Sequence, residues 1–176
     1  MQARMAGPAD MGGRTMKNLG GWVLVFIGAI GYNAYTSADR DSTGAIVGEG
    51  SVDAFDLRPG DCFNIADQWG GDSEGEVDSL PGVPCADPHE NEVYATFDLT
   101  AQSLPSEDVM WEMAFDGCES RFESFVGKDY QSSSLDILTL HPTEDSWNLK
   151  NDREVVCAVY DMNGETLTGS ARGRGL

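Results

Sequence analysis

The pattern of apolar and polar positions divides the chain into an apolar segment near its start and a longer region of short strands around one helix. The apolar segment covers residues 19–35 and contains no charged side chain. Further along, short apolar runs, several of them alternating with polar positions, predict strands at 62–65, 92–97, 135–140 and 154–160. The dipeptide Asn163-Gly164 predicts a hairpin turn, which would return the last of these strands into a further strand at 165–168.

One strong helix is predicted between the second and third of these strands. Apolar side chains recur at helical spacing from Met110 to Phe125. We expect Ser106 to cap the helix at its N-terminus and Gly127 to end it. Cys118 falls on the apolar face, so the helix should bring this cysteine against the sheet. The predicted fold class is α+β, with one main helix packed on a mostly antiparallel sheet.

The apolar segment is long enough to be read in two ways. As a helix of 17 residues it would span about 25 Å, a little less than the roughly 30 Å hydrocarbon layer of a membrane. It fits a signal peptide, with small residues after it where a peptidase could cut. It also fits an uncleaved transmembrane helix, with Trp22, Tyr32 and Tyr35 near its ends. We favour the anchor, because bulky Tyr35 makes a poor cleavage site.

The flanking charges predict how the chain is oriented. Arg14 and Lys17 precede the apolar segment, and basic flanks favour the cytoplasmic side of a membrane. We therefore expect a single-pass protein of the cell membrane with a cytoplasmic N-terminus and an extracytoplasmic C-terminal domain. The predicted divisions are a disordered cytoplasmic tail at 1–18, the anchor at 19–35, a flexible linker at 36–54, the extracytoplasmic domain at 55–170 and a C-terminal tail at 171–176.

The charge balance argues against polyanionic partners. The chain has 11 basic and 30 acidic residues and a net charge of −19. Only three of the basic and one of the acidic residues precede the apolar segment, which leaves a net charge of −21 after it. Such a domain repels nucleic acid and anionic membrane surfaces. We expect its contact with the membrane to be made through the N-terminal helix alone.

The cysteines indicate an oxidising compartment. An even number of them, Cys62, Cys85, Cys118 and Cys157, follows the apolar segment. Four cysteines allow three pairings, and the sequence alone does not choose among them. We favour Cys62 with Cys85, which would clamp the ends of an acidic loop, and Cys118 with Cys157, which would staple the helix to the sheet.

Two chemical alternatives to disulfides are weaker. Cys85 and His89 have the spacing of a zinc ligand pair, and Cys62 and His141 could complete a tetrahedron. Structural zinc sites usually show two tight ligand pairs, whereas this chain has at most one, so we predict no metal and no cofactor. Cys85 as a nucleophile with His89 as its base is weaker still, because a cysteine in an oxidising compartment is normally paired.

Other motifs support structure more than chemistry. The acidic loop at 67–79 does not match the spacing of a calcium-binding loop. The chain contains no nucleophile elbow, phosphate-binding glycine loop or dinucleotide fingerprint, and we predict no catalytic residue. Trp147, Asp152 and Arg153 are expected to form a structural corner in which Arg153 forks to a carboxylate.

An ordered run of motifs resembles the septum-formation domain family of actinobacteria. The likeness covers about residues 57–170, with one departure at Asn151, where the family pattern suggests glycine; Asn also tolerates a left-handed turn. The motifs are Gly60-Asp-Cys-Phe63, Val83-Pro-Cys-Ala-Asp-Pro-His-Glu-Asn-Glu-Val-Tyr94, Cys118, Pro142-Thr143 with Trp147, Asp152-Arg153 before Cys157, and Gly169-Ser170. The resemblance implies an extracytoplasmic domain behind a membrane helix and a link to the cell envelope and to division. It implies no catalytic residues.

Two classes of function follow. The first is a non-enzymatic, membrane-anchored protein that binds an envelope component or a division protein. Its predicted contact surface lies in the segment that contains Asp87, Pro88, His89, Glu92 and Tyr94. The alternative is a small envelope hydrolase or metal-binding protein that uses His89 and nearby carboxylates.

Overall fold

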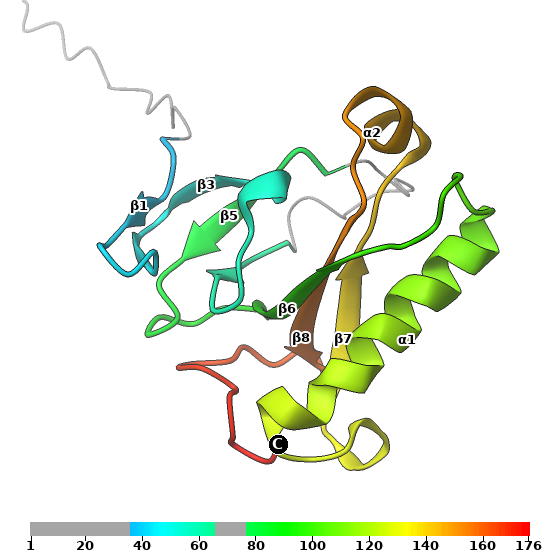
Figure 1. Ribbon diagram of the computed structural model, residues 1–176. Coiled ribbons are helices and arrows are strands. Elements are labelled where there is room, and N and C mark those ends of the chain that lie inside the picture. The colour runs from blue at the N-terminus through cyan, green and yellow to red at the C-terminus, as the bar shows by residue number, and fades with distance from the viewer. Residues whose placement is uncertain (1–35, 66–76) are drawn as a thin grey trace, which may run out of the picture. The chain divides into compact units, whose positions relative to one another are not determined.

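The computed structural model describes residues 36–65 and 77–176 (Figure 1). The predicted cytoplasmic tail and anchor lie outside these ranges, and so does most of the predicted acidic loop. In the described part of the chain, no helix combines the length and the apolar character needed to cross a membrane. The anchor therefore stays a prediction from the sequence.

An antiparallel sheet forms the centre of the domain (Figure 1). In the described ranges it has six strands in the order β3-β5-β4-β6-β8-β7, and a separate pair joins β1 to β2. The strands are β1 (Asp39–Arg40), β2 (Ile46–Gly48), β3 (Gly50–Asp53), β4 (Cys62–Phe63), β5 (Ser79–Val83), β6 (Asn91–Asp98), β7 (Leu135–Leu140) and β8 (Glu154–Asp161). The four predicted strands before the hairpin correspond to β4, β6, β7 and β8.

The predicted helix is confirmed as α1 (Glu107–Val126), which crosses one face of the sheet (Figure 1). Gly127 ends it in the left-handed region, with φ of 83°, and its N–H donates to the carbonyl of Glu123. Ser106 occupies the N-cap position, but its side chain makes no capping hydrogen bond with the described residues. The shorter elements are α2 (Glu144–Leu149), η1 (Ala54–Asp56) and η2 (Tyr130–Ser132).

Strand β8 lies between two hydrophobic cores. Val155, Cys157 and Val159 belong to the core under α1. Val156 and Ala158 point to the other face, where they join the core formed with Phe63 and other apolar residues of the first half of the domain. Because successive strand residues face opposite sides, a strand covered on both sides reads as a continuous apolar run. Residues 155–159 therefore contribute side chains to both hydrophobic cores.

The prediction of a flexible linker at 36–54 was wrong, because these residues belong to the fold. They form β1, β2 and β3, and β3 pairs with β5 along its whole length. Ile46 and Val52 are buried in the second core. The sequence showed little of this because the three strands are only two to four residues long. Such short strands carry too few apolar positions to reveal a period of two.

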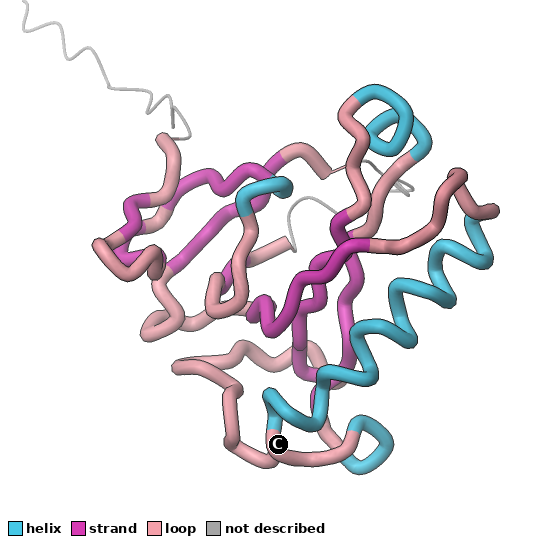
Figure 2. The backbone as a smooth tube through the Cα atoms, in the orientation of Figure 1, coloured by secondary structure: helices cyan, strands magenta, loops and turns pink. Residues whose placement is uncertain are grey.

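The predictions for the C-terminal end also need correction. The chain turns at Asn163-Gly164, where the Gly164 N–H donates to the Asp161 carbonyl, but no strand forms at 165–168. Leu167 instead forms an isolated antiparallel bridge with His89. The segment runs as a loop to the C-terminal end of α1 (Figure 2).

The predicted C-terminal tail is also packed against the domain. Ala171 is fully buried. The N–H groups of Gly173 and Gly175 donate to the carbonyls of Phe125 and Val126, at distances of 2.7 and 2.8 Å. The last carbonyls of a helix have no partner within the helix, so residues 171–176 supply one for the end of α1.

Candidate functional site

The two predicted disulfides are confirmed. Cys62 of β4 is bonded to Cys85, which follows β5, and Cys118 of α1 is bonded to Cys157 of β8. No free cysteine remains in the described residues. The second bridge lies inside the apolar core under α1, where both cysteines are fully buried. The first bridge reaches the surface on one side only, since Cys62 is fully buried and Cys85 is partly exposed.

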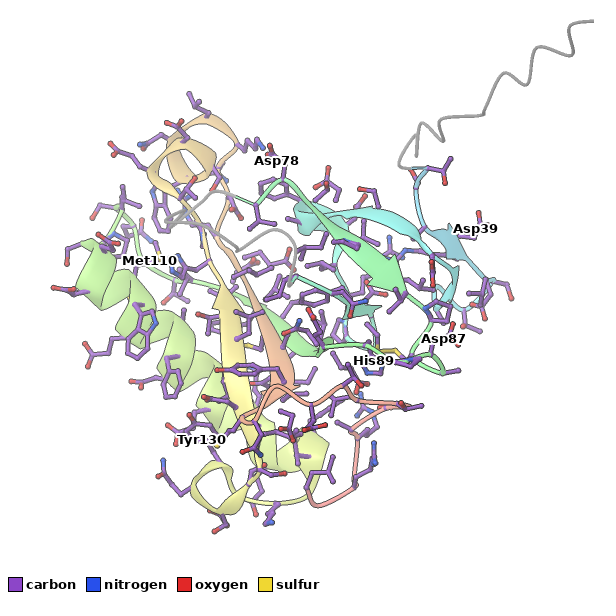
Figure 3. All side chains as sticks on the ribbon, turned by 180° about the vertical axis from the view of Figure 1, so that it is seen from behind. Asp39, Asp78, Asp87, His89, Met110 and Tyr130 are labelled. Atoms are coloured by element: carbon purple, nitrogen blue, oxygen red, sulfur yellow. A yellow bond between two sulfur atoms is a disulfide. The ribbon has the colours of Figure 1, made fainter. Side chains whose placement is uncertain are left out.

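His89 is fully buried, whereas Asp87 is exposed. Figure 3 shows the His89 side chain close to a disulfide. Its backbone pairs with Leu167 in both directions, at 3.0 and 2.7 Å. Its Nδ1 lies 2.8 Å from the carbonyl oxygen of Asp87. Because a carbonyl only accepts, Nδ1 carries a proton, and in the neutral ring Nε2 offers a lone pair. Nε2 is buried and has no hydrogen-bond partner in the described part of the chain, which costs about 1–3 kcal/mol.

Glu92 of β6 is the second buried polar side chain at this end of the sheet. It is 1% exposed. Its two carboxylate oxygens accept hydrogen bonds of 2.6 Å each from the Ser170 hydroxyl and the Ala171 N–H. A ligand atom of Glu92, a ring nitrogen of His89 and Sγ of Cys62 all lie within 4.8 Å of one another. We call Cys62, Cys85, His89 and Glu92 the bridge cluster.

The predicted contact surface is largely wrong. Asp87 and Pro88 are exposed, but His89, Glu92 and Tyr94 are at most 5% exposed and cannot touch a partner of the folded domain. The Tyr94 hydroxyl donates to the Cys118 carbonyl at 2.8 Å, and burial raises the pKa of this phenol well above its usual value. Three different contacts bury these side chains: Leu167 pairs with the His89 backbone, Ser170 and Ala171 bond to Glu92, and Tyr94 packs in the core under α1.

Trp147, Asp152 and Arg153 form the predicted corner, but Arg153 contacts an aromatic ring and backbone carbonyls in place of the expected carboxylate. The guanidinium of Arg153 lies 3.5 Å from the centre of the Trp147 ring and donates to two backbone carbonyls, those of Trp147 and Asp152. The expected fork to a carboxylate is not seen among the described residues. The Asp152 carboxylate instead accepts from the Ser146 hydroxyl, in a helix start capped by Thr143. The corner fixes α2 against β8.

A tyrosine pair surrounds one carboxylate on β7. The hydroxyls of Tyr130 and Tyr160 donate to Asp136 at 2.6 and 3.0 Å, and the Ile137 N–H adds a third bond at 2.8 Å. Burial opposes ionisation of Asp136, but these bonds outweigh it and lower the pKa of the carboxyl. Burial and the bond to Asp136 raise the pKa of Tyr130 to about 12.

A pocket of about 810 Å³ lies between the start of α1 and the β7–α2 connection. Met110, Leu140 and Val156 give it an apolar wall, and His141 and Glu154 stand among its polar residues. His141 lines this pocket and does not belong to the bridge cluster, so it cannot complete a zinc tetrahedron there as the sequence spacing allowed. No buried side-chain nitrogen or oxygen among the described pocket residues lacks a partner.

The outer face of α1 is acidic and carries one large exposed aromatic ring. Trp111 is 55% exposed and stacks on Phe115, with ring centres 5.2 Å apart. The single basic residue of the helix, Arg121, lies over the Phe97 ring. The acidic residues on the exposed face are Glu107, Asp108, Glu112, Asp116 and Glu123.

These features define a small α+β domain held by two disulfides. Comparison with known protein families assigns the domain to one of them. The model of the septum-formation family matches residues 40–157, and the chain belongs to that family. Searches of curated proteins and of solved structures find no match. The matched region begins at Arg40, inside the segment that the sequence pattern had assigned to a linker.

Proposed function

We propose that the protein is a non-enzymatic, membrane-anchored component of the cell envelope whose extracytoplasmic domain binds a partner during septum formation. The observation that carries this proposal is the pair of disulfides in a member of the septum-formation family. Disulfides persist in oxidising compartments and are rare in the cytoplasm. Together with the apolar segment at 19–35, they favour a domain held on the extracytoplasmic side of the membrane.

The burial of the bridge cluster argues against the hydrolase alternative. A general base must come within hydrogen-bond reach of its substrate. His89 and Glu92 are 0% and 1% exposed, and the carboxylate is already occupied by Ser170 and Ala171. A substrate would have to displace the 167–171 segment to reach them.

The acidic face of α1 is the contact surface that we propose in place of the one predicted from the sequence. Trp111 exposes its indole on a helix face that carries several carboxylates. The basic side chain of α1, Arg121, lies over the Phe97 ring and leaves the indole open to a partner. An indole face attracts lysine and arginine, and surrounding negative charge steers a positive partner to it. The partner is therefore a basic segment of an envelope or division protein.

The distribution of the protein in dividing cells tests this proposal. A fluorescently tagged chain should concentrate at the septum, and Trp111→Ala should abolish that enrichment at an unchanged protein level. Leu149→Ala is the matched control, because Leu149 is 80% exposed but lies on α2. An even distribution of the unaltered chain through the cell cycle would rule out the division role.

A further inference from the structure

We propose that reduction of the Cys62–Cys85 disulfide converts the bridge cluster into a zinc-binding site, with Cys62, Cys85, His89 and Glu92 as the four ligands. The inference does not depend on the proposed function. It rests on the set of ligand types that the cluster brings together and on the buried Nε2 of His89, which has no hydrogen-bond partner among the described residues.

The spacing of the cluster is close to that of a zinc site. Tetrahedral zinc holds sulfur at about 2.3 Å and nitrogen or oxygen at about 2.0–2.2 Å, which sets neighbouring ligand atoms about 3.5 Å apart. The atoms of Cys62, His89 and Glu92 lie within 4.8 Å of one another while the disulfide is intact. A contraction of about 1 Å brings them to this spacing. Cys85, which is bonded to Cys62 in the oxidised form, supplies the fourth ligand once that bond is broken.

The groups around the cluster already hold two of the ligands in place. A metal-bound histidine usually donates its other ring N–H to a carbonyl or carboxylate, which fixes the ring. His89 does this through Nδ1 and the Asp87 carbonyl, and leaves Nε2 as the free nitrogen. Ser170 and Ala171 orient Glu92, and each carboxylate oxygen retains a further lone pair for a metal.

The chemical step requires a dithiol reductant of the thiol–disulfide oxidoreductase class. One of its thiolates attacks Sγ of Cys85, the sulfur on the exposed side, and forms a mixed disulfide while Cys62 leaves as a thiolate. The second thiolate of the reductant then releases Cys85. The reductant becomes a disulfide and the protein gains two electrons; the two thiol protons of the reductant pass to solvent, because zinc binds both cysteines as thiolates.

The donor set selects the metal. Two thiolates, one imidazole and one carboxylate suit zinc, whereas calcium and magnesium take oxygen ligands only. The other disulfide provides an internal contrast. Cys118 and Cys157 lie in the apolar core, and no histidine or carboxylate of the described residues is close enough to bind a metal ion together with them.

The test is a zinc and cobalt titration of the purified full-length chain before and after reduction with a phosphine. The reduced chain should bind one zinc ion, show the thiolate-to-cobalt absorption band, and gain in Tm, because a ligand of the folded state stabilises it by mass action. The oxidised chain should show none of these. His89→Gln and Glu92→Gln should weaken zinc binding by at least about 10-fold, and Cys62→Ser should abolish the cobalt band.

Two controls separate this site from ordinary thiol chelation. His141→Gln and the double variant Cys118→Ala/Cys157→Ala should bind zinc as the reduced parent does. The proposal is overturned if the reduced chain binds no zinc, if zinc leaves its Tm unchanged, or if the double variant loses the site while His89→Gln keeps it.

Discussion

Arg40 forms a bidentate ion pair with Asp61, a residue 21 positions further along the chain. Two guanidinium nitrogens lie 2.5 and 2.8 Å from the two carboxylate oxygens, and the Asp61 side chain is only 3% exposed. The carboxylate also accepts from the Arg58 N–H, and Arg40 donates to the Gly44 carbonyl. The pair therefore joins β1 and the loop after it to the turn that leads into β4.

Removing the arginine should destabilise the domain. Arg40→Ala leaves the buried Asp61 carboxylate without its counter-ion, and breaking a buried ion pair costs about 3–5 kcal/mol. Because the Arg40 side chain is 20% exposed, we expect the lower end of that range. Urea unfolding of Arg40→Ala and of Arg58→Ala, an exposed arginine near the same carboxylate, should show a large loss only for the first. Equal losses would contradict the role of the pair.

The N-terminal strands should be required for folding. A chain that begins at Phe55 lacks β1, β2 and β3 and exposes the core residues that pack against Ile46 and Val52. On heating, this shorter chain should show a broad change in signal without a cooperative unfolding transition. A chain that begins at Thr36 should unfold with a sharp transition, as monitored by circular dichroism. A cooperative transition in the shorter chain would show that 36–54 is a dispensable linker after all.

Gly117 should resist replacement by alanine even though alanine favours helices. Alanine would gain about 1 kcal/mol of helix propensity. A Cβ at this position would overlap the Phe97 ring, with two further ring atoms at 2.7 and 2.8 Å, and overpacking costs about 1–3 kcal/mol. We expect Gly117→Ala to lower the free energy of unfolding by about 1 kcal/mol.

A second substitution shows whether the ring is the cause. In Phe97→Leu the clash is relieved, so adding Gly117→Ala to that variant should cost nothing or stabilise the helix. Chemical denaturation of the four chains completes the cycle. The same loss in both backgrounds would assign the effect to something other than Phe97.

Asp136 should make the stability of the domain depend on pH. Its pKa is lowered in the folded state, so its contribution is present above the unfolded pKa of about 3.9 and is lost as the pH falls through the folded value. Asp136→Asn should therefore destabilise the domain near neutral pH and progressively less in acid. Thermal unfolding across this range, with Glu112→Gln as an exposed control for the lost charge, measures the effect. A pH-independent difference would exclude this linkage.

How far the sequence predicts this fold depends on how regular each element is. The helix and β6, β7 and β8 are long enough to show their periods, and placing Cys118 on the helix and Cys157 on β8 favoured the pairing that the structure shows for these two cysteines. Strand β5 was not predicted, because its Pro81-Gly82 pair looks like a turn. In the structure the glycine is in a strand where a side chain would not fit, since a Cβ there would lie 2.5 Å from Val52.

The candidate site was predicted in its parts but not in its arrangement. Cys62, Cys85, His89 and Glu92 were all singled out from their residue types. The burial of His89 and Glu92 was not foreseen, because both contact residues 167–171, and the pairing of Leu167 with His89 is an isolated bridge that gives no periodic pattern in the sequence. Arg40 and Asp61 lie in polar stretches where nothing distinguishes an ion pair from solvated charges. Contacts of this kind are set by the tertiary fold.

The two disulfides also determine how the chain survives proteolysis. Each closes a covalent ring, one from residue 62 to 85 and the other from 118 to 157. A single cut inside either ring leaves every residue joined to the rest through sulfur. A cut between the rings, in β6 for example, separates the molecule into two pieces. Under oxidising conditions, nicks between Cys62 and Cys85 would therefore pass unseen on a gel until the sample is reduced.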